Sequence, residues 1–424
     1  MGLKIITSQE KKIVLKNFFS LSTLQGINYL LPVVVLPYLI RVIGPEKFGL
    51  IAFAQAFVQY FMILTDYGFS LSATKKISLC QQDKKNIAQI FSSVMTVKMA
   101  LATVSFFILL AIIRFVPRFR HDWLVYILSF GAVVGNTLFP VWFYQGKEKM
   151  AYIATINIIG GVLYAASVFL LVRGPEDYLY VPFLNSLFFL ITGVTGLYIA
   201  FNKFGVSFIF QTYEDIQKEL KAGWSIFISI VAINTYTTTR TFAVGLLTNN
   251  VLTGYYSIAE RIANVIQTFP LDSLSQALYP RINKIFKKDR RRAMKLMRRI
   301  QKSTMLSYLA MLPLVFWAAP LLVNIFCGKD YHQVVIIFRI LLFPVFFIGS
   351  NAFRVQFLLV CARTDLYSKL HIGAALAGLP LIFFCIHEFS YFGAAFATTI
   401  IEAGVIISTF QLIRKYVLPP PDLH

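Results

Sequence analysis

The chain divides into about twelve apolar stretches, each long enough to cross a bilayer as a helix and joined by short, mostly basic loops. A hydrocarbon core of roughly 30 Å requires about twenty mainly apolar helical residues per crossing, whereas a barrel strand needs about ten residues of alternating polarity. The hydrophobic fraction of 57% and the charged fraction of 14% also indicate lipid as the solvent. The sequence therefore predicts an all-α polytopic membrane protein.

The predicted spans follow directly from the apolar runs. They cover residues 17–40, 48–66, 89–113, 123–144, 151–172, 179–201, 224–248, 255–279, 303–326, 333–360, 370–388 and 393–413. Between them, Lys and Arg number 28 on the side of the N-terminus and 7 on the opposite side. Because short cytoplasmic loops are enriched in Lys and Arg, both termini are predicted to be cytoplasmic.

The net charge of +21 is explained by these loops, where anionic headgroups attract cations, and does not indicate nucleic acid as a partner. The densest basic run, Lys287 to Arg299, is compatible with a short amphipathic helix on the inner leaflet, or with a regulatory or partner-binding segment. The four cysteines have no paired spacing and are predicted to be free thiols. The sequence contains no Walker A motif and no zinc-like cluster, so we expect neither a cofactor nor a metal site.

A faint internal repeat is present at an offset of 205 residues. Gly49, Ala54 and Gln55 fall opposite Gly254, Ala259 and Glu260. This offset divides twelve spans into two sets of six that enter the membrane in the same orientation. We therefore expect two pseudo-symmetric six-helix bundles, 1–201 and 224–424, around a central cavity that opens to each side in turn, with an amphipathic linker helix within 202–223.

Five cations lie inside predicted spans, where a charge costs several kcal/mol unless it faces a cavity or a partner. They are Lys98, Arg240, Arg261, Arg339 and Arg354. Arg240 and Arg354 lie deepest and are predicted to line a cavity, and Arg339 and Arg354 could mark two levels of one cationic wall. Two readings stay open for the other three cations. Either they bind substrate, or Arg261 pairs with a local acid while Arg339 and Lys98 extend to the interfaces.

Polar residues also recur at helical spacing within three spans. These stripes consist of Gln55, Gln59 and Asp66; of Asn234, Thr238 and Thr241; and of Glu260, Asn264 and Gln267. Each stripe alone could be interhelical hydrogen bonding, but three at matched places favour a wet cavity. Gln55, Gln59, Asn234 and Asn264 are accordingly candidate substrate-binding residues.

Four acids lie inside or at the ends of spans: Asp66, Glu260, Asp272 and Glu402. Each either neutralises an arginine or exchanges a coupling ion, H⁺ or Na⁺. Glu260 adjoins Arg261 in sequence, which favours a structural role. Glu402 has no cation within two turns of its own segment, so it is the preferred candidate for ion coupling.

The segment from Asn17 to Ser78 contains an early proline-bearing helix, a Leu-Pro-Tyr-Leu run ending at Leu39, and Asp66-Tyr67-Gly68 before a basic loop. In these features it resembles the start of Wzx-type O-antigen and polysaccharide flippases, a branch of the multidrug, oligosaccharidyl-lipid and polysaccharide exporter superfamily. The resemblance implies a bacterial inner-membrane protein of lipopolysaccharide biosynthesis. Its implied activity is to move an undecaprenyl-diphosphate-linked oligosaccharide to the periplasmic leaflet, alongside a polysaccharide polymerase and chain-length machinery.

Two other functions remain as alternatives. A drug or small-solute exporter of the same superfamily fits the architecture, although a mainly cationic cavity would favour an anionic cargo. A membrane-embedded polymerase or ligase would be an enzyme, but such chains resemble proteins with one large periplasmic loop, and no outer loop here exceeds about ten residues. A non-enzymatic transporter is therefore expected.

Overall fold

The computed structural model describes residues 8–361 and 363–416; within that part, side chains are described except at residues 8–25, 27–30, 32, 269–270, 272–281, 283–284, 287–288, 291, 359 and 364. Every regular element in these ranges is helical, as predicted. The chain forms two compact units, described separately below. Unit 1 comprises Met1–Gly44 and Ala54–Val231, and unit 2 comprises Pro45–Phe53 and Ala232–His424.

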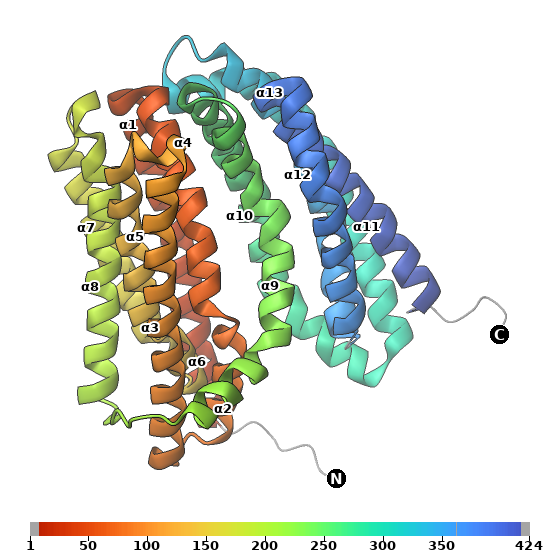
Figure 1. The fold of residues 1–424 in the computed structure, drawn as a ribbon. Helices are drawn as coiled ribbons and strands as arrows, with labels where there is room; N and C mark the ends of the chain where they lie inside the picture. Colours follow the sequence, from red (N-terminus) through yellow and green to blue (C-terminus); the bar gives the residue numbers. More distant parts are fainter. Residues whose placement is uncertain (1–7, 362, 417–424) are drawn as a thin grey trace. The chain divides into compact units, whose positions relative to one another are not determined.

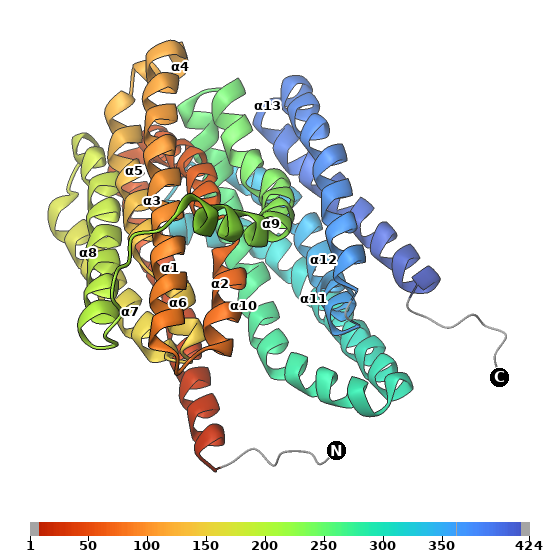
Figure 2. The same ribbon diagram turned by 60° about the horizontal axis from the view of Figure 1, so that its bottom comes forward.

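Unit 1 is a bundle whose longest helices run alongside one another, with α8 packed against α5 and α7, and α3 against α5 (Figure 1). Its elements are most of α1 (Ser8–Asp66), α2 (Phe69–Leu79), α3 (Lys84–Phe115), α4 (Pro117–Arg120), α5 (Trp123–Leu138), α6 (Val141–Gly146), α7 (Met150–Leu171), η1 (Pro175–Leu179), α8 (Tyr180–Asn202) and the start of α9 (Tyr213–Leu247). The short helices α2 and α6 pack together near one end of the bundle (Figure 2). An aromatic core around Phe91, Trp142 and Phe143 joins them to α3.

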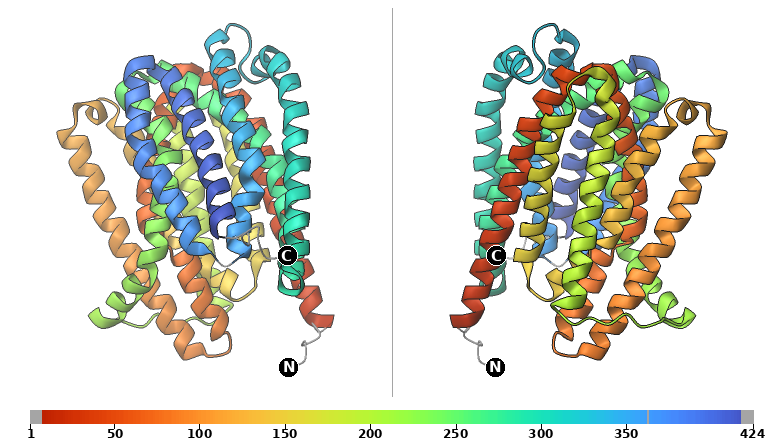
Figure 3. Two further views of the ribbon diagram at one scale, coloured as in Figure 1. Left: turned by 90° about the vertical axis from the view of Figure 1, so that its right-hand side faces the viewer. Right: turned by 90° about the vertical axis from the view of Figure 1, so that its left-hand side faces the viewer.

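Unit 2 contains the remainder of α9, α10 (Asn250–Lys288), α11 (Arg290–Cys327), α12 (His332–Val360) and α13 (Thr364–Tyr416). Helix α12 packs against α10, α11 and α13 (Figure 3). The segment Pro45–Phe53 of α1 also belongs to this unit. The linker helix predicted within 202–223 is not a separate element. It forms the first turns of α9, which begins at Tyr213 and continues without a break to Leu247.

Each of the twelve predicted spans coincides with helical structure to within a few residues. Eight segments of the described part are long and apolar enough to cross a membrane. Two of them, Val33–Leu79 and Asp365–Tyr416, contain 47 and 52 residues and are interrupted within their length. The expected spans 224–248 and 255–279 are not among the eight. Asn234, Arg240 and several threonines lower the hydropathy of the first, and Glu260 and Arg261 lower that of the second.

The interruptions separate neighbouring predicted spans. Gly44 has φ 73° and ψ 171°, a conformation that is essentially confined to glycine, and Pro45 follows it at the start of the next helical stretch. At the other end of the chain, Ser390 has φ 54° and divides α13 into two halves. The sequence predicts loops at 41–47 and 389–392. The breaks at Gly44 and Ser390 fall within these two ranges and confirm both boundaries.

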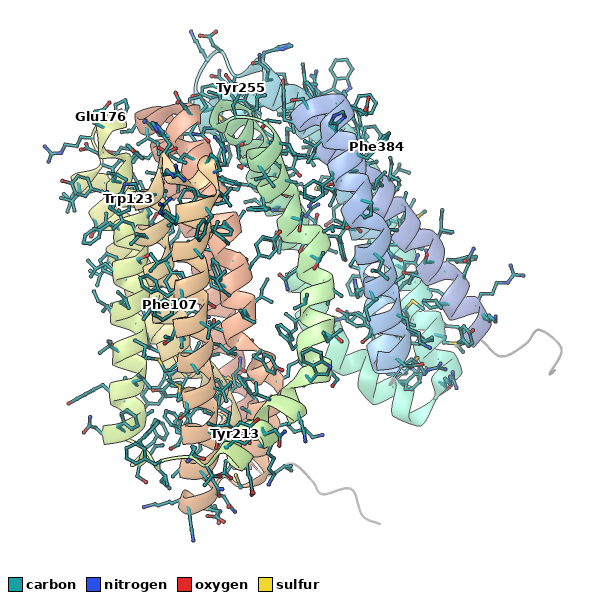
Figure 4. All side chains as sticks on the ribbon, in the orientation of Figure 1. Phe107, Trp123, Glu176, Tyr213, Tyr255 and Phe384 are labelled. Atoms are coloured by element: carbon teal, nitrogen blue, oxygen red, sulfur yellow. The ribbon has the colours of Figure 1, made fainter. Side chains whose placement is uncertain are left out.

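The surface of unit 1 is apolar along the length of the bundle. Figure 4 shows Trp123 and Glu176 at one end of this unit, Tyr213 at the opposite end, and Phe107 between them. Trp123 and Tyr213 are exposed, and Phe107 is 64% exposed. Aromatic rings at both ends with apolar side chains between them are typical of a helix bundle in a bilayer.

The basic run does not form a separate interfacial helix. The run is divided between two helices: Lys287 and Lys288 end α10, and the residues from Arg290 onward form the first turns of α11. Helix α11 is capped by a hydrogen bond from Arg292 N to the Asp289 carboxylate and continues into the span. Met294 and Met297 are buried against Phe357, Leu366 and neighbouring side chains, whereas Arg298 and Arg299 are exposed. The methionines thus bury themselves in the protein core rather than in the headgroup region.

Candidate substrate cavity

A cavity of about 280 Å³ lies inside unit 2, between α9, α10, α12 and α13. Its apolar wall comes largely from α12, including Leu341, Pro344 and Ile348. The polar wall is made by Tyr236, Arg240, Glu260, Asn264, Gln267, Asn351, His371, Thr398 and Glu402. A few convergent polar groups on an apolar background are typical of a small-molecule site.

The central charge of this cavity is a partly buried ion pair. Arg240 Nε lies 3.6 Å from Glu260 Oε1, with side chains 14% and 17% exposed. Arg240 also donates to the Thr237 carbonyl at 3.1 Å and to Thr398 Oγ1 at 3.3 Å. Glu260 therefore pairs with Arg240 on the adjacent helix, whereas its sequence neighbour Arg261 lies 5.2 Å over the ring of Phe48.

The carboxylate of Glu260 has two further donors. Thr241 Oγ1 donates to Oε2 at 2.6 Å, and the Tyr256 hydroxyl donates to Oε1 at 3.4 Å. These hydroxyls stabilise the anion in addition to the guanidinium: Thr241 donates to the oxygen that Arg240 leaves free, and Tyr256 shares Oε1 with Arg240. Arg240 can therefore exchange partners without leaving Glu260 as an unpaired buried charge.

Helix α10 presents its predicted polar stripe to the cavity. Glu260, Asn264 and Gln267 are spaced by four and three residues, and all three line the same wall. The stripe on α9 behaves differently: Thr241 supports Glu260, while Asn234 and Thr238 do not line this cavity. In unit 1, Gln55 and Gln59 are half-buried on α1.

Five polar residues of the cavity were not predicted from the sequence: Tyr236, Thr237, Asn351, His371 and Thr398. The Tyr236 hydroxyl and His371 Nδ1 are 3.0 Å apart, and His371 Nε2 is buried with no hydrogen-bond partner among the described residues. The signal available in the sequence was that Tyr236 precedes Arg240 by four residues and so shares its helical face. Nothing near His371 in the sequence distinguishes it, since its partner comes from a different helix.

Glu402 faces the same cavity from the second half of α13. It is 9% exposed, and the cavity also contains Arg240. Glu402 therefore shares its cavity with a cation from another helix, although no cation is near it in the sequence. The side chain of Asp272, the fourth candidate acid, lies outside the described residues.

Lys98 is held inside unit 1 rather than extended to the cytoplasmic interface. Its side chain is 2% exposed, Nζ lies 3.9 Å from Asp66 Oδ1, and Nζ donates to the Asn136 carbonyl at 3.5 Å. The interfacial reading of Lys98 is therefore wrong. Asp66 and Lys98 thus form one ion pair, whereas they had been predicted to have separate roles.

The two remaining arginines rest on aromatic rings. The guanidinium of Arg354 lies 5.5 Å from the ring centre of Phe410 and does not line the cavity. Arg339 lies 4.8 Å from the ring centre of Phe316 and donates to its carbonyl at 3.2 Å. The structure therefore gives them different partners, Phe410 on α13 and Phe316 on α11, and Arg240 alone of the candidate cations lines this cavity.

Comparison with known proteins identifies the family of this chain. Residues 14–286 match the family model described as "Polysaccharide biosynthesis protein". The chain belongs to this family. It is 29% identical over 401 residues to a protein of Escherichia coli (strain K12) named "Putative O-antigen transporter", covering 94% of this chain and 96% of that one. A protein of the same name from Shigella dysenteriae is 25% identical, covering 94% and 100%.

The fold is shared with solved structures of a flippase and of a multidrug transporter. The lipid II flippase MurJ in an inward closed conformation superposes with a TM-score of 0.72 at 12% identity, covering 95% of this chain and 88% of that one. An inward-facing multidrug resistance MATE family transporter of the MOP superfamily gives 0.71 at 13% identity, covering 94% and 98%. At these identities the likeness shows the fold. The resemblance to polysaccharide flippases and the all-α polytopic class are confirmed, and the chain is a multi-pass membrane protein of O-antigen and polysaccharide biosynthesis.

Proposed function

We propose that this family member translocates an undecaprenyl-diphosphate-linked oligosaccharide repeat unit from the cytoplasmic to the periplasmic leaflet of the bacterial inner membrane by alternating access. The observation that carries the proposal is a polar cavity that contains the partly buried Arg240, in a chain whose relatives are named as O-antigen transporters. The product would then reach a polysaccharide polymerase and chain-length machinery in the outer leaflet.

The cargo has three parts with different solvation needs. Its diphosphate cannot enter hydrocarbon unless fixed donors replace water, and the forked guanidinium of Arg240 is suited to that role. Its sugars need hydrogen-bonding groups, which Asn264, Gln267 and Asn351 can supply. The polyprenyl chain needs only lipid and can remain outside the cavity.

Binding would proceed by partner exchange at Arg240. In the resting pair the guanidinium is neutralised by Glu260, so Arg240 itself is not an unpaired charge in the empty cavity. An arriving diphosphate would compete for Arg240, while Thr241 and Tyr256 continue to donate to Glu260. This exchange lets the site bind an anion strongly and still release it on the other side.

Ion coupling is assigned to the acids of the same cavity. With both carboxylates ionised, Glu402 and Glu260 would carry two negative charges against one from Arg240, so uptake of one H⁺ or Na⁺ would bring the site to neutrality. We place the coupling step at Glu402, because Glu260 is already held by an arginine and two hydroxyls. Asp66 is assigned to its pair with Lys98.

The same charge count favours one alternative function. Two acids against one arginine suit a cationic substrate, and the fold is shared with multidrug transporters. On this alternative the chain would export a cationic small molecule, and Arg240 would only position Glu260.

The two functions separate in a deletion strain. A flippase defect should leave lipid-linked repeat units facing the cytoplasm and remove surface polysaccharide, with unchanged tolerance to cationic drugs. Complementation with the wild-type gene should restore surface polysaccharide, and Arg240→Ala should not, at equal membrane abundance. Arg299→Ala, which changes an exposed arginine of the same unit, is the matched control. Normal polysaccharide together with drug sensitivity in the deletion strain would instead establish the exporter.

A further inference from the structure

A second cavity in unit 2 is an open groove of about 600 Å³ between the two halves of α13. The halves run alongside each other on either side of the break at Ser390 and form the two darkest blue helices in Figure 3. The groove is distinct from the substrate cavity, although Val405 lines both. Its floor consists mainly of small side chains, including Gly373, Ala377 and Gly404.

The groove is polar at one end only. Lys369 and Lys415, both exposed, lie at the end near the start and the finish of α13. Among the residues that line the groove, no side chain is acidic. In the described part of the chain neither lysine has a carboxylate within ion-pair distance, so no described side chain neutralises the two positive charges at this mouth.

The side chains that line the groove become less polar with distance from the two lysines. Gln411 and Ser408 precede Lys415 by four and seven residues, which places them about 6 and 10 Å further along the helix. Beyond them the lining is apolar as far as Leu381 and Ile400. This order of cation, amide, hydroxyl and hydrocarbon matches the order of phosphate, glycerol, ester and acyl chain in a glycerophospholipid.

The length of the groove matches the same ligand. From Lys369 to Leu381 the first half rises about 18 Å, and from Ile400 to Lys415 the second half rises about 22 Å. One leaflet of a bilayer with a hydrocarbon core of roughly 30 Å is about 15 Å thick. The groove therefore spans one leaflet from its charged surface to the midplane.

We propose that the groove between the halves of α13 is a binding site for one anionic glycerophospholipid, with its phosphate at Lys369 and Lys415 and an acyl chain along Gly373, Ala377 and Gly404. With the C-terminus on its predicted cytoplasmic side, the lipid belongs to the inner leaflet. The site does not depend on the transported substrate, so its test is independent of the proposed function.

The glycines provide a specific way to block the acyl chain. A Cβ added at Gly373 or Gly404 meets no other atom within 4 Å, so larger side chains would enter the groove without disturbing the helices. The double variant Gly373→Leu with Gly404→Leu should fill the groove and leave both lysines in place. The double variant Lys369→Gln with Lys415→Gln should remove the headgroup cations and leave the groove open.

The experiment uses the full-length protein purified in detergent and titrated with phosphatidylglycerol, with bound lipid counted by native mass spectrometry. Because each cation near an anionic lipid contributes about a factor of five, the lysine variant should bind roughly 30-fold more weakly. The leucine variant should lose the same bound lipid while melting at the wild-type temperature without lipid. Ala310→Leu and Lys329→Gln, which change exposed residues of the same unit, should bind as wild type does.

Competitors identify the source of the ligand. Phosphatidylcholine and soluble glycerol phosphate should fail to displace phosphatidylglycerol, because the first lacks net charge and the second lacks a chain. The proposal is overturned if either double variant retains wild-type affinity, or if phosphatidylcholine competes equally. It is also overturned if a polyprenyl phosphate displaces the lipid at equal concentration, which would make the groove a substrate site.

Discussion

Gly49 and Gly254, which are 205 residues apart and equivalent in the internal repeat, lie against each other in unit 2. A Cβ on Gly49 would collide with the Asn250 carbonyl, and a Cβ on Gly254 would collide with the Pro45 carbonyl. Pro45 and Asn250 are themselves 205 residues apart. The contact is thus reciprocal, as in an isologous interface between two subunits, and a local two-fold axis passes between the glycines.

This close approach predicts that neither glycine tolerates a methyl group. Gly49→Ala and Gly254→Ala should each destabilise the protein by about 1–3 kcal/mol, because backbone atoms rather than flexible side chains occupy the space. Thermal melting of the purified protein in detergent measures the effect. Gly404→Ala is the control, since its Cβ would meet nothing within 4 Å. Equal melting of all three variants would contradict the tight crossing.

The Arg240–Glu260 pair predicts opposite effects on cargo binding. Arg240→Ala should weaken binding of a polyprenyl-diphosphate oligosaccharide by about 10- to 100-fold, as expected for loss of a charged hydrogen-bonding group. Glu260→Gln should strengthen binding, because it removes the competitor for the guanidinium. Arg354→Ala, outside the cavity, should have the smaller effect. Binding to the purified variants checks the order, and weaker binding by Glu260→Gln would exclude partner exchange.

The position of Glu402 predicts a defect in coupling rather than in binding. Glu402→Gln removes the acid that is left over after Glu260 pairs with Arg240. Transport driven by a proton or sodium gradient in proteoliposomes should fall at least tenfold, while cargo affinity stays within about twofold. Glu388→Gln, an exposed acid on the same helix, should behave as wild type. If Glu402→Gln keeps its full response to the gradient, the coupling step must lie elsewhere.

A third ion pair, between Lys76 and Glu219, holds the beginning of α9 on α2 within unit 1. Lys76 Nζ lies 2.7 Å from Glu219, whose side chain is 7% exposed. Lys76→Met should destabilise the protein by about 3 kcal/mol, because it leaves the glutamate buried without its cation. Adding Glu219→Gln to that variant should recover most of the loss. A double-mutant cycle of melting temperatures tests this, and simple additivity of the two losses would argue against the pair.

Cys361, just beyond the end of α12, predicts slow and strongly pH-dependent labelling. Burial raises the pKa of its thiol to about 11, despite the nearby Arg290 and Arg363. Little thiolate is present at neutral pH, so the maleimide rate should rise about tenfold per pH unit up to pH 11. At pH 7.5 it should be more than tenfold slower than at an introduced cysteine replacing the exposed Gln82.

The same pair of cysteines tests the orientation of the chain. Both positions lie on the predicted cytoplasmic side, so an impermeant reagent should label neither of them in intact cells and both in inverted vesicles. Labelling of the Gln82→Cys variant from the periplasm would reverse the predicted topology. Comparable rates for the two positions at pH 7.5 would contradict the burial of Cys361.

The sequence alone was sufficient to predict the helices and most of the polar wall that α10 contributes to the cavity. Apolar runs predict spans because a backbone in lipid must satisfy its hydrogen bonds internally, which leaves the helix as the available form for such runs. The spacing of Glu260, Asn264 and Gln267 predicts a shared face because that face depends only on helical periodicity. The repeat was visible at Gly49 and Gly254, although only the structure shows that they meet.

The partners of the buried charges were decided by the tertiary structure. Glu260 pairs with Arg240 instead of its neighbour Arg261, and Lys98 is held by Asp66 from another helix. His371 gained significance only when Tyr236 was found opposite it. Adjacent residues on a helix point about 100° apart, whereas residues on packed helices can meet tip to tip. Helix formation is thus local and readable from the sequence, but charge pairing in a membrane protein depends on which helices pack together.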